Sequence, residues 1–161
     1  MIKRFAAILA LAAALPAAAQ SVPATNFTDM WWNPAESGWG ISFVQHSGSN
    51  QVFAVWYTYD PREQDPATGQ FKPLWFVMPG GNWSTPTTLT GAVYVLNGVP
   101  FSQAGSNRMQ DQVGQFTFNF ANSSSGTFAY SITPPSGLAS DRPAFNLPSL
   151  SGTKQIVRQS F

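Results

Sequence analysis

The sequence predicts an all-β protein, specifically a small antiparallel up-and-down β-barrel of seven to eight strands. Short runs rich in β-branched and aromatic residues fill the chain after its N-terminal stretch, turn residues separate these runs, and none follows a helical period. Most neighbouring runs are joined by short connections, which favours antiparallel pairing of consecutive strands. Closing eight strands into a barrel removes the sheet edges, and a β-sandwich is the competing architecture.

The first 19 residues have the pattern of a secretory signal peptide. Basic residues open the chain, residues 5–15 are apolar, and residues 17–19 are alanines that suit a signal peptidase. The apolar run is too short to span a bilayer as a helix, which needs roughly 20 residues. We therefore expect residues 1–19 to be removed, residues 20–161 to form a single β-barrel domain, and the protein to be secreted or periplasmic.

The composition argues against several classes of protein. Without the leader, 142 residues carry six basic and seven acidic side chains with no basic run, which argues against binding to nucleic acid or to an acidic membrane surface. Only 9% of the full chain is charged whereas 43% is hydrophobic, which excludes a disordered chain. Cysteine is absent, so disulfides and thiolate chemistry are excluded.

The expected strands are separated by clear turn signals, among which Asn97-Gly98 is the strongest. Two segments break the regular spacing: residues 60–72 are expected to form a long hairpin loop, and residues 133–152 an irregular, proline-rich loop. Loops of that length are usually functional or mobile. The expected strands are residues 26–32, 39–46, 52–59, 74–78, 87–96, 113–120, 126–132 and about 153–160.

The strands differ in how many of their faces are apolar. Residues 113–120 and 126–132 alternate between apolar and polar residues, which predicts one buried and one solvated face. Residues 52–59 and 74–78 are apolar on both faces, so they must be covered on both sides or present an apolar patch. We expect this side of the barrel to meet a partner, a ligand or the protein's own long loops.

The densest unusual cluster is the string WWNPAESGWG at residues 31–40. In a structural interpretation, its three indoles plug one end of the barrel and Glu36 caps nearby amides. In a functional interpretation, the indoles form a pocket rim, since they offer flat apolar faces and N–H donors, and Glu36 is a charged acceptor. Buried tryptophans usually pack, which favours the structural interpretation.

The string WWNPAESGWGISFVQ, followed by VWYTYD, PLWFVMPGG, TGAVYV and VGQFTFNF, resembles an uncharacterised family of small exported β-domains from proteobacteria. The resemblance covers most of the chain after the leader. It implies a compact all-β domain and an exported location, and it implies no catalytic residues. The architecture also looks like that of avidin-like and lipocalin-like meander barrels, although Gly38-Trp39-Gly40 differs from the lipocalin Gly-x-Trp motif.

Candidate catalytic residues are few. His46 is the only histidine, and it could join a serine and one of Asp29, Asp60 or Asp111 in a triad, but the chain has no Gly-x-Ser-x-Gly elbow. One histidine without cysteine does not build a typical zinc site. Glycosidase chemistry needs two carboxylates at a set separation, which the sequence does not reveal.

Two further possibilities are weak. Asp60, Glu63 and Asp65 offer oxygen ligands for Ca²⁺, but their spacing differs from an EF-hand loop, and a charged exposed loop is the simpler interpretation. The terminal Phe161 is typical of outer-membrane barrels, but the alternating residues before it are too polar to face lipid. We predict no metal, no cofactor and no integral membrane insertion.

We therefore predict an exported, non-catalytic binding or interaction module with an aromatic-rich surface. Its partner is expected to be a small molecule, a carbohydrate or an apolar protein surface. One alternative is a homo-oligomer with its interface on residues 52–59 and 74–78, and another is a hydrolase using Glu36 or His46. The predicted ligand-binding residues are Trp31, Trp32, Asn33, Glu36, Trp39, Trp56, Tyr57, Tyr59 and Trp75.

Overall fold

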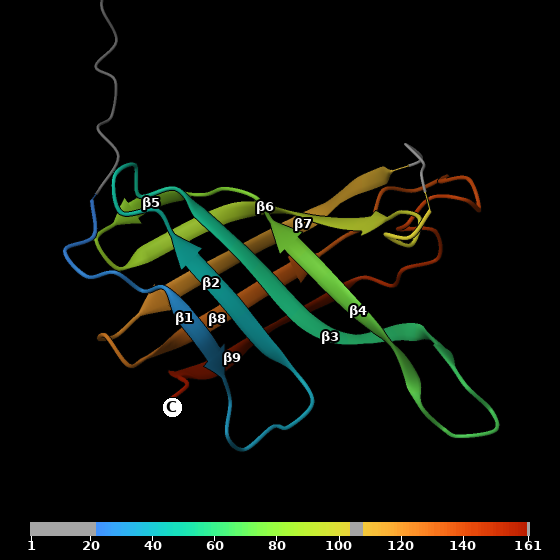
Figure 1. Ribbon diagram of the computed structural model, residues 1–161, viewed down its shortest axis with the longest axis horizontal. Helices are drawn as coiled ribbons and strands as arrows, with labels where there is room; N and C mark the ends of the chain where they lie inside the picture. The colour runs from blue at the N-terminus through green and yellow to red at the C-terminus, as the bar shows by residue number, and fades with distance from the viewer. Residues whose placement is uncertain (1–21, 104–107, 161) are drawn as a thin grey trace, which may run out of the picture.

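The computed structural model describes residues 22–103 and 108–160 (Figure 1). The expected signal peptide lies outside the described residues. The described chain is all-β, and its strands form one antiparallel sheet. The strands are β1 (Asp29–Trp32), β2 (Gly40–Gln45), β3 (Val52–Gln64), β4 (Phe71–Met78), β5 (Asn82–Thr85), β6 (Thr88–Asn97), β7 (Met109–Phe120), β8 (Ser125–Ile132) and β9 (Leu150–Arg158).

Eight of these strands close into a barrel, which confirms the predicted fold and rules out the sandwich. Strands β1 to β4 form one half, which crosses over the half made by β6 to β9 (Figure 1). The halves meet at two short seams, where β1 pairs with β9 and β4 pairs with β6 through two residue pairs each. Strand β5 is an extra strand that pairs with β6, and the sequence did not predict it.

Two expected connections differ from the prediction. Strand β3 continues to Gln64 and β4 already begins at Phe71, so most of the expected loop 60–72 is the outer part of a β-hairpin with a register shift. Strand β6 ends at Asn97, where the Asn97-Gly98 signal predicts its end, but β7 begins at Met109 and not at residue 113 as predicted. The Asn97 side chain accepts a hydrogen bond from the Met109 backbone N–H at 3.2 Å, which fixes the base of this connection.

Aromatic side chains fill the barrel interior. The alternation in β7 turns Phe116, Phe118 and Phe120 inward, as predicted, and all three are buried. The ring of Phe120 lies almost parallel to that of Phe27, with 3.9 Å between centroids. Such ring pairs contribute about 0.5–1.5 kcal/mol each beyond the burial of their area. The interior is therefore a packed core, as expected of an eight-stranded barrel.

The two ends of the barrel are closed differently. At the end that holds the β2–β3 hairpin, Phe27 and Trp83 cover the core, and the Trp83 indole N–H donates to the Asn50 carbonyl oxygen at 2.9 Å. At the opposite end the irregular segment 133–149 buries Ala144 and Leu147 against the core. We call residues 133–149 the plug loop.

Two side chains anchor the plug loop to the barrel. The buried carboxylate of Asp111 on β7 accepts hydrogen bonds from the Arg142 guanidinium and from the Ala144 backbone N–H at 3.0 Å. Arg62 on β3 donates through Nη1 to the carbonyl oxygens of Pro143 and Phe145 at 2.8 and 3.0 Å. These contacts explain how a segment without regular secondary structure is fixed over the barrel end. No helix in the described part of the chain has the length and apolar character to cross a membrane.

Replacing Asp111 by alanine should release the plug loop. The change leaves the Ala144 N–H without its acceptor and leaves the Arg142 guanidinium only the Gln110 carbonyl oxygen, so we expect the free energy of unfolding to fall by about 2 kcal/mol. Urea unfolding measures this loss, and limited proteolysis should cut within residues 133–149 of the variant first. The control is Lys72→Ala, which breaks an exposed ion pair with Glu63 and should change stability by less than about 0.5 kcal/mol. Equal proteolysis of both variants and the wild type would contradict the anchoring role.

Candidate functional site

The structure separates eight of the nine predicted ligand-binding residues into an interior group, a loop group and an outer group, and Trp32 belongs to none of them. Trp31 and Trp56 point into the barrel and are only 0% and 7% exposed. The indole N–H of Trp31 donates to the Phe27 carbonyl oxygen at 3.0 Å, and the Trp56 ring lies 4.7 Å from that of Tyr130. Both tryptophans are part of the core. Trp32 follows Trp31 on β1, is half-buried, and pairs with Val157 of β9.

The loop group lies between β1 and β2 and centres on Glu36. Its Oε2 accepts hydrogen bonds from Lys154 Nζ at 2.6 Å and from the Trp39 indole N–H at 3.3 Å, and its Oε1 accepts one from Asn33 Nδ2 at 3.2 Å. We call these four residues the Glu36 clasp. Strand β1 pairs with β9 only at residues 157–158. The clasp attaches the β1–β2 loop to Lys154, which lies in the part of β9 that β1 does not pair with.

The electrostatics of the clasp do not suit Glu36 as a general acid. The hydrogen bond from Lys154, assisted by Trp39 and by the charge of Lys154, lowers the pKa of Glu36 despite some desolvation. The same hydrogen bond raises the pKa of Lys154. A general acid at neutral pH needs a raised carboxyl pKa, which is the opposite shift. Glu36 therefore serves as an ionised structural acceptor.

His46 is far from Glu36 in the fold. It begins the β2–β3 hairpin, at the end of the barrel opposite the β1–β2 loop. Its Nδ1 accepts hydrogen bonds from the backbone N–H groups of Gly48 and Ser49 at 3.2 and 3.1 Å, within its own turn. The hydrolase alternative, which uses Glu36 or His46, thus has its two candidate residues at separate places, and the Ser49 hydroxyl lies 3.1 Å from His46 Nδ1 within the hairpin turn.

The carboxylates considered for Ca²⁺ are engaged separately. Asp60 binds the Arg62 guanidinium, Glu63 pairs with Lys72, and Asp65 accepts a hydrogen bond from the Ala67 N–H at 2.8 Å within its own turn. Within residues 22–103 and 108–160, no group of three or more His, Cys, Asp or Glu side chains is placed to hold a metal ion.

The outer group lies on the solvent side of β3 and β4. Tyr57, Tyr59 and Trp75 are 46%, 52% and 50% exposed, and Tyr57 stands opposite Trp75 in the strand register. Neighbouring outward positions are also apolar: Val44 stands opposite Phe53, and both are about half exposed. Successive outward residues on three strands thus form one surface, which we call the aromatic face. It consists of Val44, Phe53, Val55, Tyr57, Tyr59, Trp75 and Val77, of which Val55 is itself buried, and the half-buried Ser42 is its polar neighbour opposite Val55.

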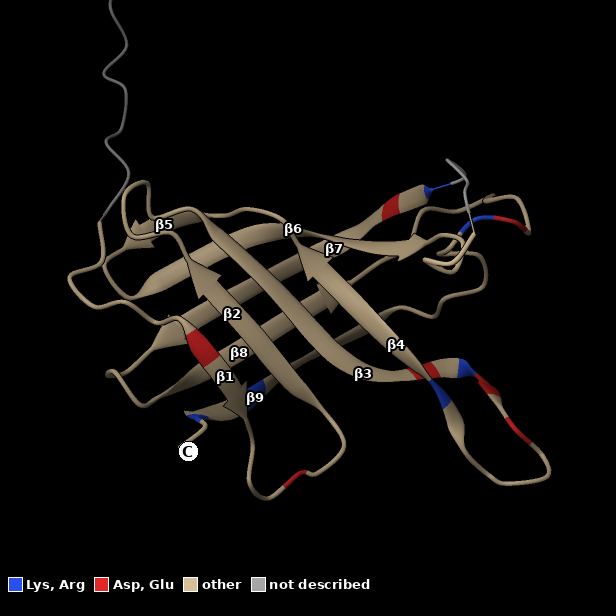
Figure 2. Ribbon diagram, viewed as in Figure 1, with Lys and Arg blue, Asp and Glu red and all other residues tan. Residues whose placement is uncertain are grey.

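The aromatic face carries no charge at any of these described positions. Figure 2 shows that the central parts of β2, β3 and β4 are free of charged residues, which lie on the outer part of the β3–β4 hairpin, on β1, β7 and β9, and in the loops. The plug loop covers the barrel end and leaves this surface open. Residues 52–59 and 74–78 were expected either to be covered on both sides or to present an apolar patch, and the structure shows the exposed apolar patch. Contiguous patches of this kind mark interaction sites more often than scattered apolar residues do.

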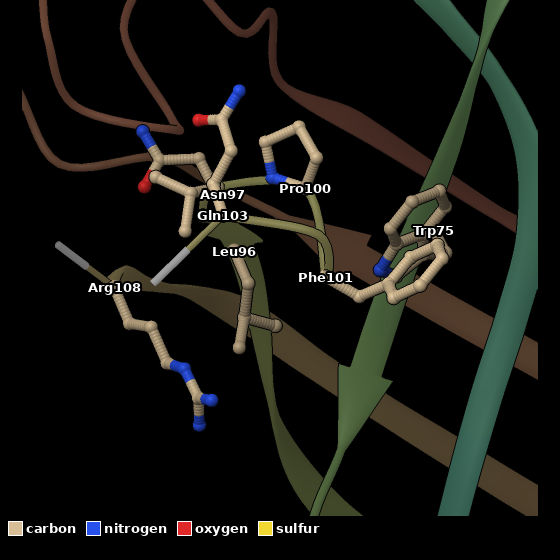
Figure 3. A pocket seen from close by; sticks show the side chains of 9 residues that line it. Trp75, Leu96, Asn97, Pro100, Phe101, Gln103 and Arg108 are labelled. Atoms are coloured by element: carbon tan, nitrogen blue, oxygen red, sulfur yellow. The ribbon is translucent and has the colours of Figure 1, made fainter. Parts of the chain in front are cut away.

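A cavity adjoins the aromatic face at Trp75 (Figure 3). It has a volume of about 730 Å³ and lies between β4, the end of β6 and the loop that follows. The Phe101 side chain is fully exposed on that loop, beside Trp75. Sequence reasoning missed Phe101, since a single aromatic after a proline carries no periodic signal. The lining residues are Trp75, Leu96, Asn97, Gly98, Val99, Pro100, Phe101, Gln103 and Arg108.

In comparisons with protein-family models, curated proteins and solved structures, nothing matches this chain. The resemblance to exported proteobacterial β-domains therefore stays a prediction.

Replacing Glu36 by glutamine should lower the melting temperature in a pH-dependent way. Because the folded-state pKa of Glu36 lies below its ordinary value of 4.5, the clasp contributes fully above that value, and its contribution disappears as the pH falls through the lowered pKa. Thermal unfolding of both proteins from neutral to acidic pH measures the difference. It should be present at neutral pH and vanish in acid.

The matched control for this measurement is Glu63→Gln, which breaks the largely exposed ion pair with Lys72. We expect this variant to melt close to the wild type at every pH, because exposed ion pairs contribute little. A Glu36→Gln difference that stays constant down to acidic pH would show that the charge of Glu36 has no part in the clasp.

Proposed function

We propose that this protein is an exported, non-catalytic interaction module that binds its partner on the aromatic face. The observation that supports the proposal is the half-exposed, charge-free set of Phe53, Tyr57, Tyr59 and Trp75 on one side of a barrel whose interior is already filled. The export part of the proposal rests on the signal-peptide pattern of residues 1–19.

The packed interior supports binding outside the barrel. A barrel that binds a ligand inside needs an unfilled interior. Here Trp56 is surrounded by the rings of Phe76, Phe116, Phe128 and Tyr130, at centroid distances from 4.7 to 5.9 Å. Trp31 and Trp56 are therefore assigned to the core, and we leave them out of the proposed contact surface.

The composition of the aromatic face supports an interaction role. The centres of protein interfaces are enriched in Tyr, Trp and Phe and depleted of charged residues. A few aromatic side chains near the centre usually dominate the binding energy. Tyr57 and Trp75 are directly opposite one another in the register, so they form the natural centre of the surface.

The proposal predicts that Tyr57 and Trp75 are shielded in the cell. Hydroxyl-radical footprinting of cells that express the full chain, compared with dilute purified protein, measures this shielding. We expect lower oxidation of both residues in the cell, on a mature species that begins at Gln20 and is found in the exported fraction.

Phe145 on the plug loop is half-exposed away from the aromatic face and serves as the internal reference, because its oxidation should not change. A variant with Gln115→Thr and Ser131→Thr, a cross-strand pair on the opposite half of the barrel, should show the wild-type footprint. Equal oxidation of Tyr57 and Trp75 in the cell and in dilute solution would overturn the proposed surface.

A further inference from the structure

We infer that the partner on the aromatic face is a second copy of this chain, so that two barrels associate through β2, β3 and β4. This inference rests on the proposed function and names the occupant of the same surface. Four properties of the surface carry it: its area, its lack of charge, the kind of side chains between its rings, and the projection and depression at Phe101.

The area is close to what one side of a stable dimer requires. An aromatic side chain presents roughly 150–250 Å², so the half-exposed Phe53, Tyr57, Tyr59 and Trp75 together present about 400 Å². Phe101 is fully exposed beside Trp75 and adds about 200 Å². The exposed aliphatic residues Val44, Leu96 and Val99 extend the same side. Specific interfaces bury about 800 Å² on each partner, which this surface nearly provides.

The lack of charge suits self-association. In a two-fold dimer the same surface lies on both partners, so any central charge can be brought near its own copy. The described positions of the aromatic face hold no charge, and the exposed Glu63–Lys72 pair lies beyond it, on the outer part of the β3–β4 hairpin. Two copies can therefore meet without opposing like charges at the centre.

The side chains between the rings favour a protein over a sugar. A carbohydrate stacks on aromatic rings but also needs hydrogen-bond partners for its hydroxyl groups. Here Val55 stands opposite Val77 in the register, and Val44 stands opposite Phe53. Another apolar surface would bury Val44 and Val77, whereas Val55 is already buried and the half-buried Ser42 opposite it is the described position between the rings that offers a hydroxyl.

Phe101 provides a projection and its neighbourhood provides a depression. The cavity of about 730 Å³ is lined by Trp75, Leu96, Pro100, the basic Arg108 and the exposed Phe101 ring itself. In an isologous dimer, a projection and a depression on one surface are each used twice. We assign Phe101 of each copy to the cavity of the other.

Sedimentation equilibrium of the purified mature protein over a wide concentration range tests this inference. We expect a monomer–dimer equilibrium in the wild type and a monomer in the variant Tyr57→Thr with Trp75→Thr. Threonine is chosen because it retains a high preference for strands. The variant Phe101→Ser lies in a loop, so it should fold normally and weaken the dimer about tenfold or more.

The double variant Gln115→Thr with Ser131→Thr, on the opposite half of the barrel, should dimerise like the wild type. A wild type that stays monomeric at the highest soluble concentration, or a dimer unaffected by both Tyr57→Thr with Trp75→Thr and Phe101→Ser, would overturn the inference. If the protein is monomeric while Tyr57 and Trp75 are shielded in the cell, the proposed surface stands and its partner is a different molecule. If the purified protein is monomeric and Tyr57 and Trp75 are not shielded in the cell either, the proposed function fails as well.

Discussion

The stacking of aromatic rings inside the barrel is the interaction on which the rest of the structure depends. Phe120 contacts the rings of Phe27, Trp31 and Phe43, and Phe128 contacts those of Trp56, Phe116 and Phe118. This chain has no disulfide and few charged residues, so burial of these rings must supply most of its stability. Because the rings occupy the interior, the exposed rings outside it are not needed to fill the core.

The barrel closes through little backbone pairing, and side chains from the connections complete it. Each seam has only two residue pairs in the register. The Glu36 clasp attaches the β1–β2 loop to β9 near one seam, and Asp111 and Arg62 hold the plug loop over the adjacent barrel end. Carboxylates that resemble catalytic candidates in the sequence thus have structural roles. The charged residues of the clasp and of the plug-loop anchors lie away from the aromatic face, which is neutral.

The sequence predicted the fold because strand signals are local. Residues 113–120 and 126–132 alternate strictly, so the buried positions of Phe116, Phe118 and Phe128 followed from the period of two. Strand β5 was missed because four residues with one aromatic give too weak a pattern. The outer part of the β3–β4 hairpin was missed because its strands are polar and exposed, and they contain prolines that argue against strands.

The candidate site was predicted only in part, because both faces of residues 52–59 are apolar. Trp56 and Tyr57 look equally suited to binding in the sequence, and only closure of the barrel places one inside and the other outside. The residue pairs that anchor the loops could not be predicted, because Glu36 and Lys154 are 118 residues apart in the sequence, and Arg62 and Pro143 are 81 apart.

The central claim is that the inner rings hold the fold and the outer rings are free to bind. Urea unfolding at concentrations too low for association tests it most directly. The variant Tyr57→Thr with Trp75→Thr should lose about 1 kcal/mol of unfolding free energy, against about 3–5 kcal/mol for Phe120→Ala. Comparable losses in the two variants would contradict the account.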